Sequence, residues 1–313
     1  TPVYNDWSSF VQLALELDEC ARQQDSVCFG LIAVDDGSTE IMQTAFELEA
    51  CKHIQEISVL HLARNLGHQK AIALGLAYVN AKMEFDCVIV MDADGEDQPR
   101  DIANLLEESN RSPNRIVFAR RARRSEGLLF RVFYVLYQAF FKLLTGHRIT
   151  FGNFSLIPRS QLNRVVHLPE IWNHFAAGIM RARIPWSVIP TRRGVRYAGR
   201  SSMDFIALVV HGLSAISVYI EILTVRLIMA SLATIGIGIL GFLVLLYVRY
   251  LTPLAIPGWA TNVAIGIVII LFQAVVLLTL LAFLSLNYRS SKLFIPAKDY
   301  QDYLLNLEQI HVN

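Results

Sequence analysis

Blocks of apolar and polar residues alternate along the first 120 residues of the chain, at the lengths of strands and helices. Continuous apolar runs predict strands over 27–34, 57–62, 86–91 and 115–119. Between them, apolar residues at helical spacing predict helices over 5–24, 39–52, 67–82 and from Pro99 onward. Because the strands are apolar throughout rather than alternately polar, they indicate an α/β fold, a mostly parallel sheet with helices on both faces.

The pattern loosens after residue 120. We expect an aromatic-rich helix over 124–145 and short strands near 153–157 and 186–191. Residues 203–225 are apolar but carry Asp204, His211 and Glu221. Such a pattern is typical of amphipathic helices that lie in a membrane interface, and a third membrane span is the alternative.

Two long uncharged runs dominate the last third of the chain. Residues 227–248 and 250–288 contain no Asp, Glu, Lys or Arg. A helix of the first run's length spans about 33 Å, against about 30 Å for the hydrocarbon core of a bilayer. We therefore expect two membrane-spanning helices, the second over about 263–286, because Pro253 and Pro257 break the region between them.

Charge supports this division. Charged residues make up 18% of the chain, against about a quarter in soluble domains, and the deficit falls in the two uncharged runs. The flanks of the runs carry the basic residues Arg226, Arg289, Lys292 and Lys298, whereas the connecting loop carries Arg249 alone. Basic residues favour the cytoplasmic side, so we expect the soluble part and the tail in the cytoplasm. The net charge of +1 gives no electrostatic basis for a nucleic-acid partner.

These boundaries predict four parts of a multi-pass protein of the inner or plasma membrane. They are a cytoplasmic catalytic domain over 1–200, amphipathic juxtamembrane helices over 201–226, two transmembrane helices with a short outer loop over 227–288, and a cytoplasmic tail over 289–313. Gly236, Gly238 and Gly241 let helices pack closely, within or between chains, and we expect a homo-oligomer.

Acidic residues follow the strand predicted over 86–91. Asp92 and Asp94, with one residue between them, can reach a common cation, and Glu96 and Asp97 come directly after them. Mg²⁺ and Mn²⁺ prefer such oxygen ligands and are commonly held by a few carboxylates together with substrate phosphates. Ligands of parallel sheets bind beyond the carboxyl ends of the strands, so we expect a metal site here.

A second acidic pair, Asp35 and Asp36, ends the strand over 27–34. A carboxylate at this place can accept hydrogen bonds from a base N–H or from ribose hydroxyls. A plain turn is the alternative, because Asp, Gly and Ser all favour turns.

Arginines gather in two groups, Arg120, Arg121, Arg123, Arg124 and Arg131, and then Arg192, Arg193, Arg196 and Arg200. Arginine is suited to bidentate contacts with phosphate. Attraction to anionic lipid headgroups is the other interpretation, and both can hold.

Four motifs in order resemble glycosyltransferase family 2. They are Pro2-Val3-Tyr4-Asn5, Val34-Asp35-Asp36-Gly37-Ser38-Thr39, Arg64-Asn65-Leu66-Gly67, and Asp92-Ala93-Asp94 with Asp97-x-Pro99. The two C-terminal spans make the chain similar to the polyprenyl-phosphate glycosyltransferases of that family, such as dolichol-phosphate mannose synthases and undecaprenyl-phosphate glucosyltransferases. The resemblance implies a Rossmann-like GT-A fold, a nucleotide-sugar donor, Mg²⁺ or Mn²⁺, and inversion at the anomeric carbon. The chain opens at Thr1, and we expect the family's first strand to precede it.

The resemblance also implies roles for individual residues. The nucleotide sugar would be bound by Pro2, Tyr4, Asn5, Asp35, Asp36, Asn65, Gly67, Lys70 and Asp92. The metal would be held by Asp92, Asp94 and Glu96. The catalytic residues would be Asp94, Arg120 and Arg131, and the acceptor phosphate would contact Arg124, Arg196, Arg200 and Ser201. Asn153 stands where many relatives have an aspartate, which removes a general base from this position.

The expected reaction is transfer of a sugar, with UDP-glucose as the favoured donor, to a polyprenyl phosphate on the cytoplasmic membrane face. A lipid phosphate is already ionised near neutral pH, since the second pKa of a phosphate monoester is about 6, so it can attack without a strong base. The alternatives are a membrane-bound polysaccharide synthase of the same family and a non-catalytic membrane scaffold. His53, His61 and His68 show no metal-ligand pattern and are interpreted as satisfied or exposed histidines.

Overall fold

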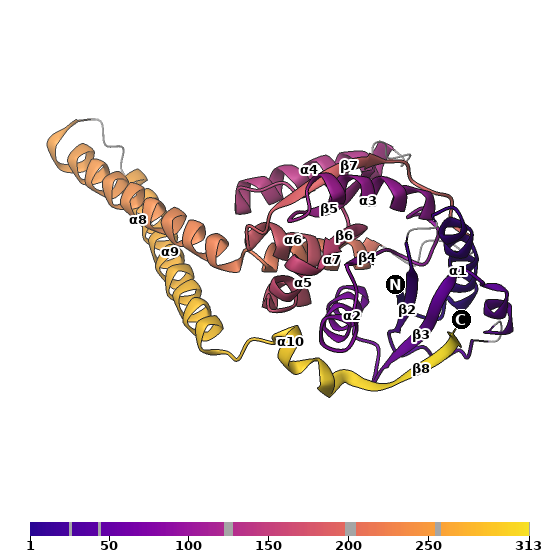
Figure 1. The fold of residues 1–313 in the computed structure, drawn as a ribbon. Coiled ribbons are helices and arrows are strands. Elements are labelled where there is room, and N and C mark those ends of the chain that lie inside the picture. Colours follow the sequence, from indigo (N-terminus) through magenta and orange to yellow (C-terminus); the bar gives the residue numbers. More distant parts are fainter. Residues whose placement is uncertain (25–26, 43–44, 122–127, 198–204, 254–257, 313) are drawn as a thin grey trace. The chain divides into compact units, whose positions relative to one another are not determined.

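The computed structural model describes the chain except for residues 25–26, 43–44, 122–127, 198–204, 254–257 and 313 (Figure 1). The chain divides into two units. One comprises Thr1–Gln138, Arg148–Val218 and Leu293–Asn313, and the other comprises Ala139–His147 and Tyr219–Lys292. Within the residues described, the strands belong to the first unit and the two long helices to the second.

Two four-stranded sheets build the first unit. The first has the order β1 (Pro2–Val3), β2 (Phe29–Asp35), β3 (Ile54–Leu62) and β8 (Leu304–Val312). The second has the order β4 (Cys87–Val90), β6 (Ser155–Pro158), β5 (Ile116–Arg121) and β7 (Trp186–Thr191). Thr1 joins them, because its amino group donates to Ile32 O of β2 at 2.8 Å and its hydroxyl to Met91 O, just after β4, at 2.6 Å.

Helices cover both faces of the sheets, as the apolar strands predicted. Successive strand residues enter different cores. Val34 and Leu60 pack with Leu74 of α2 (His68–Lys82). Their neighbours Ala33 and Val59 pack with Leu13 of α1 (Trp7–Arg22) and Leu105 of α3 (Ile102–Arg111). The predicted α/β architecture is confirmed.

The strand pairing is mixed rather than mostly parallel, which corrects the sequence prediction. Three described pairs are parallel, β1–β2, β2–β3 and β5–β7. The other three are antiparallel, β3–β8, β4–β6 and β5–β6. β6 enters between β4 and β5 in the opposite direction, and β8 comes from the far end of the chain.

The helix expected over 39–52 is wrong. Its described residues contain only a 3₁₀ turn, η1 (Ala45–Ala50). The Asn5 side chain accepts hydrogen bonds from the backbone N–H groups of Thr39 at 2.8 Å and Glu40 at 3.1 Å. Those contacts hold the start of the segment against the chain's first turn.

The other predicted elements are found close to their expected limits. Of the shorter helices, η2 (Pro99–Asp101) and α7 (Phe205–Ser217) were predicted, whereas α5 (Arg159–Val166), η3 (Pro169–Trp172) and α6 (Phe175–Arg181) were not. The aromatic-rich helix is α4 (Leu128–Thr145).

The C-terminal segment is part of the first unit rather than a separate tail. It forms α10 (Pro296–Asp299), η4 (Tyr300–Tyr303) and then β8, which pairs with β3 from Glu56 to Leu62. Phe294 packs on Trp172 with ring centroids 3.8 Å apart, and Tyr303 O accepts from Ala63 N at 2.9 Å. Residues before and after the long helices therefore share one core.

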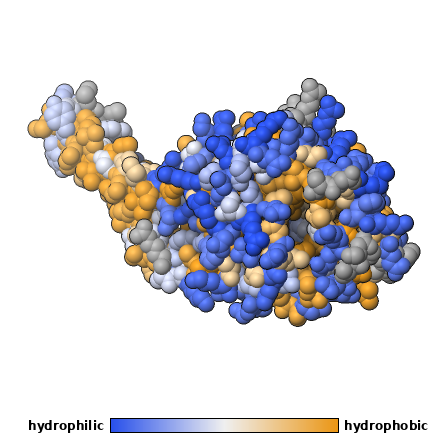
Figure 2. Space-filling model, in the orientation of Figure 1, coloured by the Kyte–Doolittle hydropathy of each residue, from blue (hydrophilic) through white to orange (hydrophobic). Residues whose placement is uncertain are grey.

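The second unit contains α8 (Ile220–Leu251) and α9 (Trp259–Ser290). Both are long and apolar enough to cross a membrane, by length and composition, and much of their visible surface is apolar (Figure 2). They pack closely at Gly238, where an added Cβ would lie 2.6 Å from Leu271 Cδ2. In contrast, a Cβ at Gly236 would meet no atom within 4 Å, so only part of the predicted glycine set serves this pair.

Candidate active site

The loop that follows β4, here called the acidic loop (residues 92–97), folds through its own carboxylates. Asp97 accepts from the backbone N–H of Asp92 at 3.0 Å, and Asp94 Oδ1 accepts from Glu96 N at 2.9 Å. Gly95 allows the turn between them, with φ of 84°. Asp94 and Asp97 thus shape the loop, while Asp92 and the second oxygen of Asp94 are directed to other groups.

Residues 193–197, here called the arginine segment, lie over the acidic loop. Gly194 N donates to Glu96 O at 2.9 Å and Tyr197 N to Asp94 O at 3.1 Å. The fit is tight, because a Cβ at Gly194 would overlap Gly95 O. Only a glycine lets the two backbones approach this closely.

Two arginines of this segment pair with the acidic side chains. Arg196 contacts Asp94 Oδ2 through Nη2 at 2.6 Å and Glu96 Oε1 through Nε at 3.0 Å. Arg193 contacts the same Glu96 oxygen at 2.5 Å. Glu96 is 7% exposed and is enclosed by these two cations.

Burial raises the pKa of the Asp94 carboxyl above its usual value. The Glu96 N–H and Arg196 favour the charged form, whereas the charges of Asp92 and Glu96 oppose it. Burial and the neighbouring carboxylates therefore destabilise the charged form of Asp94, and added positive charge would stabilise it.

His68, the first residue of α2, brings an imidazole to the acidic loop. Its Nε2 lies 3.1 Å from Asp92 Oδ1 and 3.0 Å from the amide nitrogen of Asn153. Gln69 fixes Asn153 by donating to its Oδ1 at 3.2 Å. Burial lowers the pKa of His68, but the charges of Asp92, Asp97 and Asp94 more than offset this, so the pKa is raised. Sequence reasoning missed His68; the available signal was its place directly after the Arg64-Asn65-Leu66-Gly67 motif.

The acidic side chains of this loop agree only in part with the metal site expected from the sequence. Asp92 and Asp94, whose side chains are 29% and 16% exposed, offer the oxygen ligands that Mg²⁺ or Mn²⁺ prefers. Glu96 does not fit as a third ligand, because its Oε1 already meets two arginines. Within the described ranges no three His, Cys, Asp or Glu side chains converge on one ion position. A cation here would rest on Asp92, Asp94 and oxygen atoms of a bound diphosphate.

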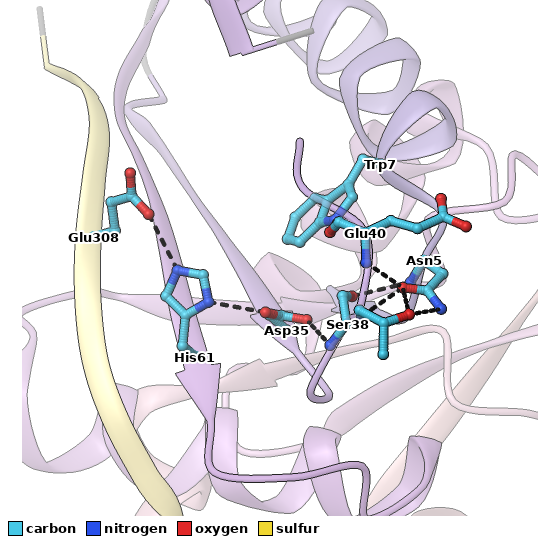
Figure 3. Close-up of polar contacts among 8 residues, drawn as sticks. Asn5, Trp7, Asp35, Ser38, Glu40, His61 and Glu308 are labelled. Carbon is cyan, nitrogen blue, oxygen red and sulfur yellow. Dashed lines mark hydrogen bonds and ion pairs between the residues drawn. The ribbon is translucent and has the colours of Figure 1, made fainter. Parts of the chain in front are cut away.

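A second cluster forms at the carboxyl end of β2 (Figure 3). Asp35 Oδ1 accepts from Ser38 N at 2.8 Å, and its Oδ2 lies 2.8 Å from His61 Nδ1. Asn5 is held against Ser38, which accepts from Asn5 N at 3.0 Å. Next to this cluster is a pocket of about 360 Å³ that Asp35, Ser38 and His61 help to line.

Asp36 has a different environment from Asp35. Its two carboxylate oxygens accept from Leu66 N at 2.7 Å and from Gly67 N at 2.8 Å. Burial raises the pKa of Asp36, although these donors favour its charged form. A Cβ at Gly37 would lie 2.5 Å from Asn65 N, which shows how closely the two turns approach. Asp36 therefore ties the 64–67 turn to β2.

The remaining predicted residues are spread over the unit. Tyr4, Asn65 and Arg120 are exposed, and Pro2 pairs with Val34. Lys70 lies over the ring of Trp172, 5.1 Å from its centroid. Arg124, Arg200 and Ser201 fall outside the described residues, as does the side chain of Arg131, which belongs to α4.

The sequence is similar to those of known bacterial proteins. The uncharacterized glycosyltransferase YkcC of Bacillus subtilis is 25% identical over 289 residues, which cover 89% of this chain and 84% of YkcC. The undecaprenyl-phosphate 4-deoxy-4-formamido-L-arabinose transferase of Photorhabdus laumondii is 28% identical over 165 residues, covering 53% of this chain and 48% of that protein. The chain thus spans about half the length of this second relative.

Among solved structures, the glucosyl-3-phosphoglycerate synthase of Mycobacterium tuberculosis in complex with Mn²⁺, UDP-glucose and phosphoglyceric acid has a similar fold. The TM-score is 0.50 with 15% sequence identity, covering 71% of this chain and 77% of that one. Residues 1–172, more than half of the chain, match the family description Glycosyl transferase family 2, and they include the acidic loop, His68 and Asp35. The chain belongs to glycosyl transferase family 2.

Proposed function

We propose that this chain transfers a sugar, with glucose favoured, from a nucleotide sugar to a polyprenyl phosphate at the cytoplasmic face of a membrane. The observation that carries the proposal is the acidic loop with Arg193, Arg196 and the imidazole of His68 against it. It places carboxylates for a cation beside groups that bind phosphate. Such a site suits a reaction between two anionic substrates.

The charge balance of the site favours a diphosphate leaving group. Asp94 is buried among other carboxylates, and its contact with Arg196 offsets only part of the cost. A divalent cation held by Asp92 and Asp94 would neutralise charge that develops on the departing diphosphate. Arg196 would then be released from Asp94 to contact a phosphate oxygen, at an arginine–phosphate geometry that it is suited to make.

The side chain at position 153 is an amide rather than a base, which favours an acceptor that needs no deprotonation. Asn153 accepts from Gln69 and its amide nitrogen lies 3.0 Å from His68 Nε2, so its side chain is a fixed amide, which is not a proton acceptor. An ionised lipid phosphate needs no deprotonation. One of its oxygens attacks C1 of the donor sugar, the bond from C1 to the diphosphate breaks with its electron pair leaving on the diphosphate, and the configuration at C1 inverts. No proton moves in this step.

The membrane assignment rests on α8 and α9 and on the position of β8. Because β8 pairs with β3, the chain before α8 and the chain after α9 belong to one unit. If the helices cross the bilayer, they cross as a pair, so that both ends of the pair return to the same face. The basic flanking residues Arg226, Lys292 and Lys298 then favour the cytoplasmic face for that unit. The named acceptor of the Photorhabdus relative, undecaprenyl phosphate, supports a lipid of this class.

The test uses the full-length chain in detergent with Mg²⁺, undecaprenyl phosphate and a panel of nucleotide sugars. We expect release of one nucleoside diphosphate that depends on the lipid phosphate, together with a lipid-linked monosaccharide. Asp94→Asn should abolish transfer. Asp86→Asn is the matched control, since Asp86 is an exposed aspartate next to the opposite end of β4.

Full activity of Asp94→Asn, or in excess EDTA, would contradict the proposed chemistry. A product with more than one sugar per lipid or without lipid would favour the polysaccharide synthase. If no nucleotide sugar is consumed, the scaffold interpretation stands.

A further inference from the structure

The C-terminal strand β8 continues the row of residues that begins at Asp35. Asp35 lies opposite His61 in the β2–β3 pair, and His61 lies opposite Asn306 in the β3–β8 pair. Residues directly opposite each other in a sheet point to the same face. A strand that follows both long helices in sequence thus places a side chain beside the carboxyl end of β2.

Contacts join this strand to Asp35. His61 stands between two carboxylates, with Nδ1 2.8 Å from Asp35 Oδ2 and Nε2 3.2 Å from Glu308 Oε2 (Figure 3). Glu308 is two residues beyond Asn306 and therefore shares its face of β8. The orientation of the imidazole that faces Asp35 is set from the C-terminal strand.

The pocket next to Asp35 is lined by residues from the N-terminal and the C-terminal regions of the sequence. Asp35, Ser38, His61 and Arg64 line it from the ends of β2 and β3, and Leu305 and Asn306 line it from β8. Its volume of about 360 Å³ lies within the range of small-molecule sites, about 300–1,000 Å³. Among the described residues no hydrogen bond of the Asn306 side chain is found, so its amide is available to a ligand.

We infer that β8 completes the pocket for the nucleobase of the donor, with Asn306 contacting the base and Glu308 acting as a positioning residue through His61. The inference rests on the proposed function for the class of donor. A carboxylate accepts hydrogen bonds and donates none, so Asp35 suits a base with a ring N–H. Uracil and guanine carry such an N–H beside a carbonyl, and the Asn306 amide can donate to that carbonyl. Adenine and cytosine present a lone pair at the equivalent ring position.

Substitutions in β8 separate recognition from folding. Asn306→Ala removes the amide, and Glu308→Ala removes the partner of His61. Glu308→Gln is the conservative variant, because its amide oxygen still accepts a hydrogen bond from an imidazole N–H. Gln309→Ala is the matched control: Gln309 is on the opposite face of the same strand and donates to Glu56 Oε1 at 3.2 Å.

The measurement is calorimetric titration of the full-length chain in detergent with UDP, GDP, ADP and CDP in Mg²⁺, and separately with inorganic diphosphate, which has no base. We expect the wild-type chain to prefer UDP or GDP over ADP and CDP. Asn306→Ala should weaken binding of the preferred nucleotide about tenfold, the loss of one good hydrogen bond, while diphosphate affinity stays within about twofold. Glu308→Ala should weaken the same nucleotide, Glu308→Gln should restore most of the affinity, and Gln309→Ala should bind as the wild type does.

Two outcomes would overturn the inference and leave the proposed function in place. In the first, Asn306→Ala and Glu308→Ala bind the preferred nucleotide as tightly as the wild type. In the second, nucleotide and diphosphate affinities fall together, so that β8 merely supports the fold. A wild-type chain that binds none of the four nucleotides would overturn the proposed function and this inference together.

Discussion

The contact between Gly194 and the acidic loop allows a sharp test of how the site is built. A Cβ at position 194 would overlap Gly95 O and lie 2.9 Å from both Gln98 Cγ and Gln98 Nε2. The Gln98 side chain can move, but the Gly95 carbonyl is backbone in a loop held by Asp94 and Asp97. Gly194→Ala must therefore lift the arginine segment away from the acidic loop.

The expected cost has two parts. Forcing extra volume into a packed contact costs about 1–3 kcal/mol. The hydrogen bond from Gly194 N to Glu96 O, 2.9 Å long, is lost as well, which adds about 1 kcal/mol. At about 2–4 °C per kcal/mol for a domain of this size, the melting temperature should fall by roughly 4–16 °C.

The assay is thermal unfolding of the full-length protein in detergent, followed by intrinsic fluorescence. Gly152→Ala is the matched control, because a Cβ there meets no atom within 4 Å, and its melting temperature should be almost unchanged. Equal melting temperatures for the two variants would refute the close approach of the arginine segment to the acidic loop. Gly194→Ala should also lose diphosphate affinity, since Arg193 and Arg196 move with the segment.

Three further predictions concern buried polar groups. Glu96→Gln leaves Arg193 and Arg196 without a charged partner at Oε1. Because these arginines are only 30% and 28% exposed, we expect the free energy of unfolding to fall by about 2 kcal/mol. An unchanged midpoint of urea unfolding would contradict this prediction. Asp36→Asn turns one acceptor toward Leu66 N or Gly67 N into a donor, and should cost about 2 kcal/mol in the same assay, whereas Asp86→Asn should cost nothing measurable. Burial, with the nearby His211, lowers the pKa of His174 from 6.5 to about 3. The neutral imidazole therefore stabilises the folded chain in full above pH 6.5. This stabilisation is lost as the pH falls toward 3, by up to about 1.4 kcal/mol per pH unit. His174→Asn keeps an acceptor for Ala177 N and should reduce that slope; urea midpoints between pH 7 and 5 that fall equally in both proteins would contradict the assignment.

Local sequence patterns predicted the positions of the candidate site residues. The apolar runs located β2 and β4, and polar residues directly after them located Asp35 and the acidic loop, because these signals lie within a few residues of each other. The partners of those residues come from distant parts of the chain. Arg196 meets Glu96 across 100 positions, and His61 meets Glu308 across 247.

These long-range contacts depend on the order of the strands in the sheets, and the spacing of strands along the sequence does not determine that order. For this reason Arg196 was assigned to the acceptor phosphate and Glu96 to a metal, although the structure pairs them with each other. β8 was missed for a related reason, since its residues form a strand against β3 and were interpreted as a free tail.

The pairing of β8 with β3 also fixes an order of events during synthesis. The ribosome delivers β3 early, but its partner is made only after both long helices have been completed. Until then the edge of β3 exposes unpaired backbone groups, which are prone to join other strands. The first unit therefore reaches its final sheet only after both long helices have been synthesised.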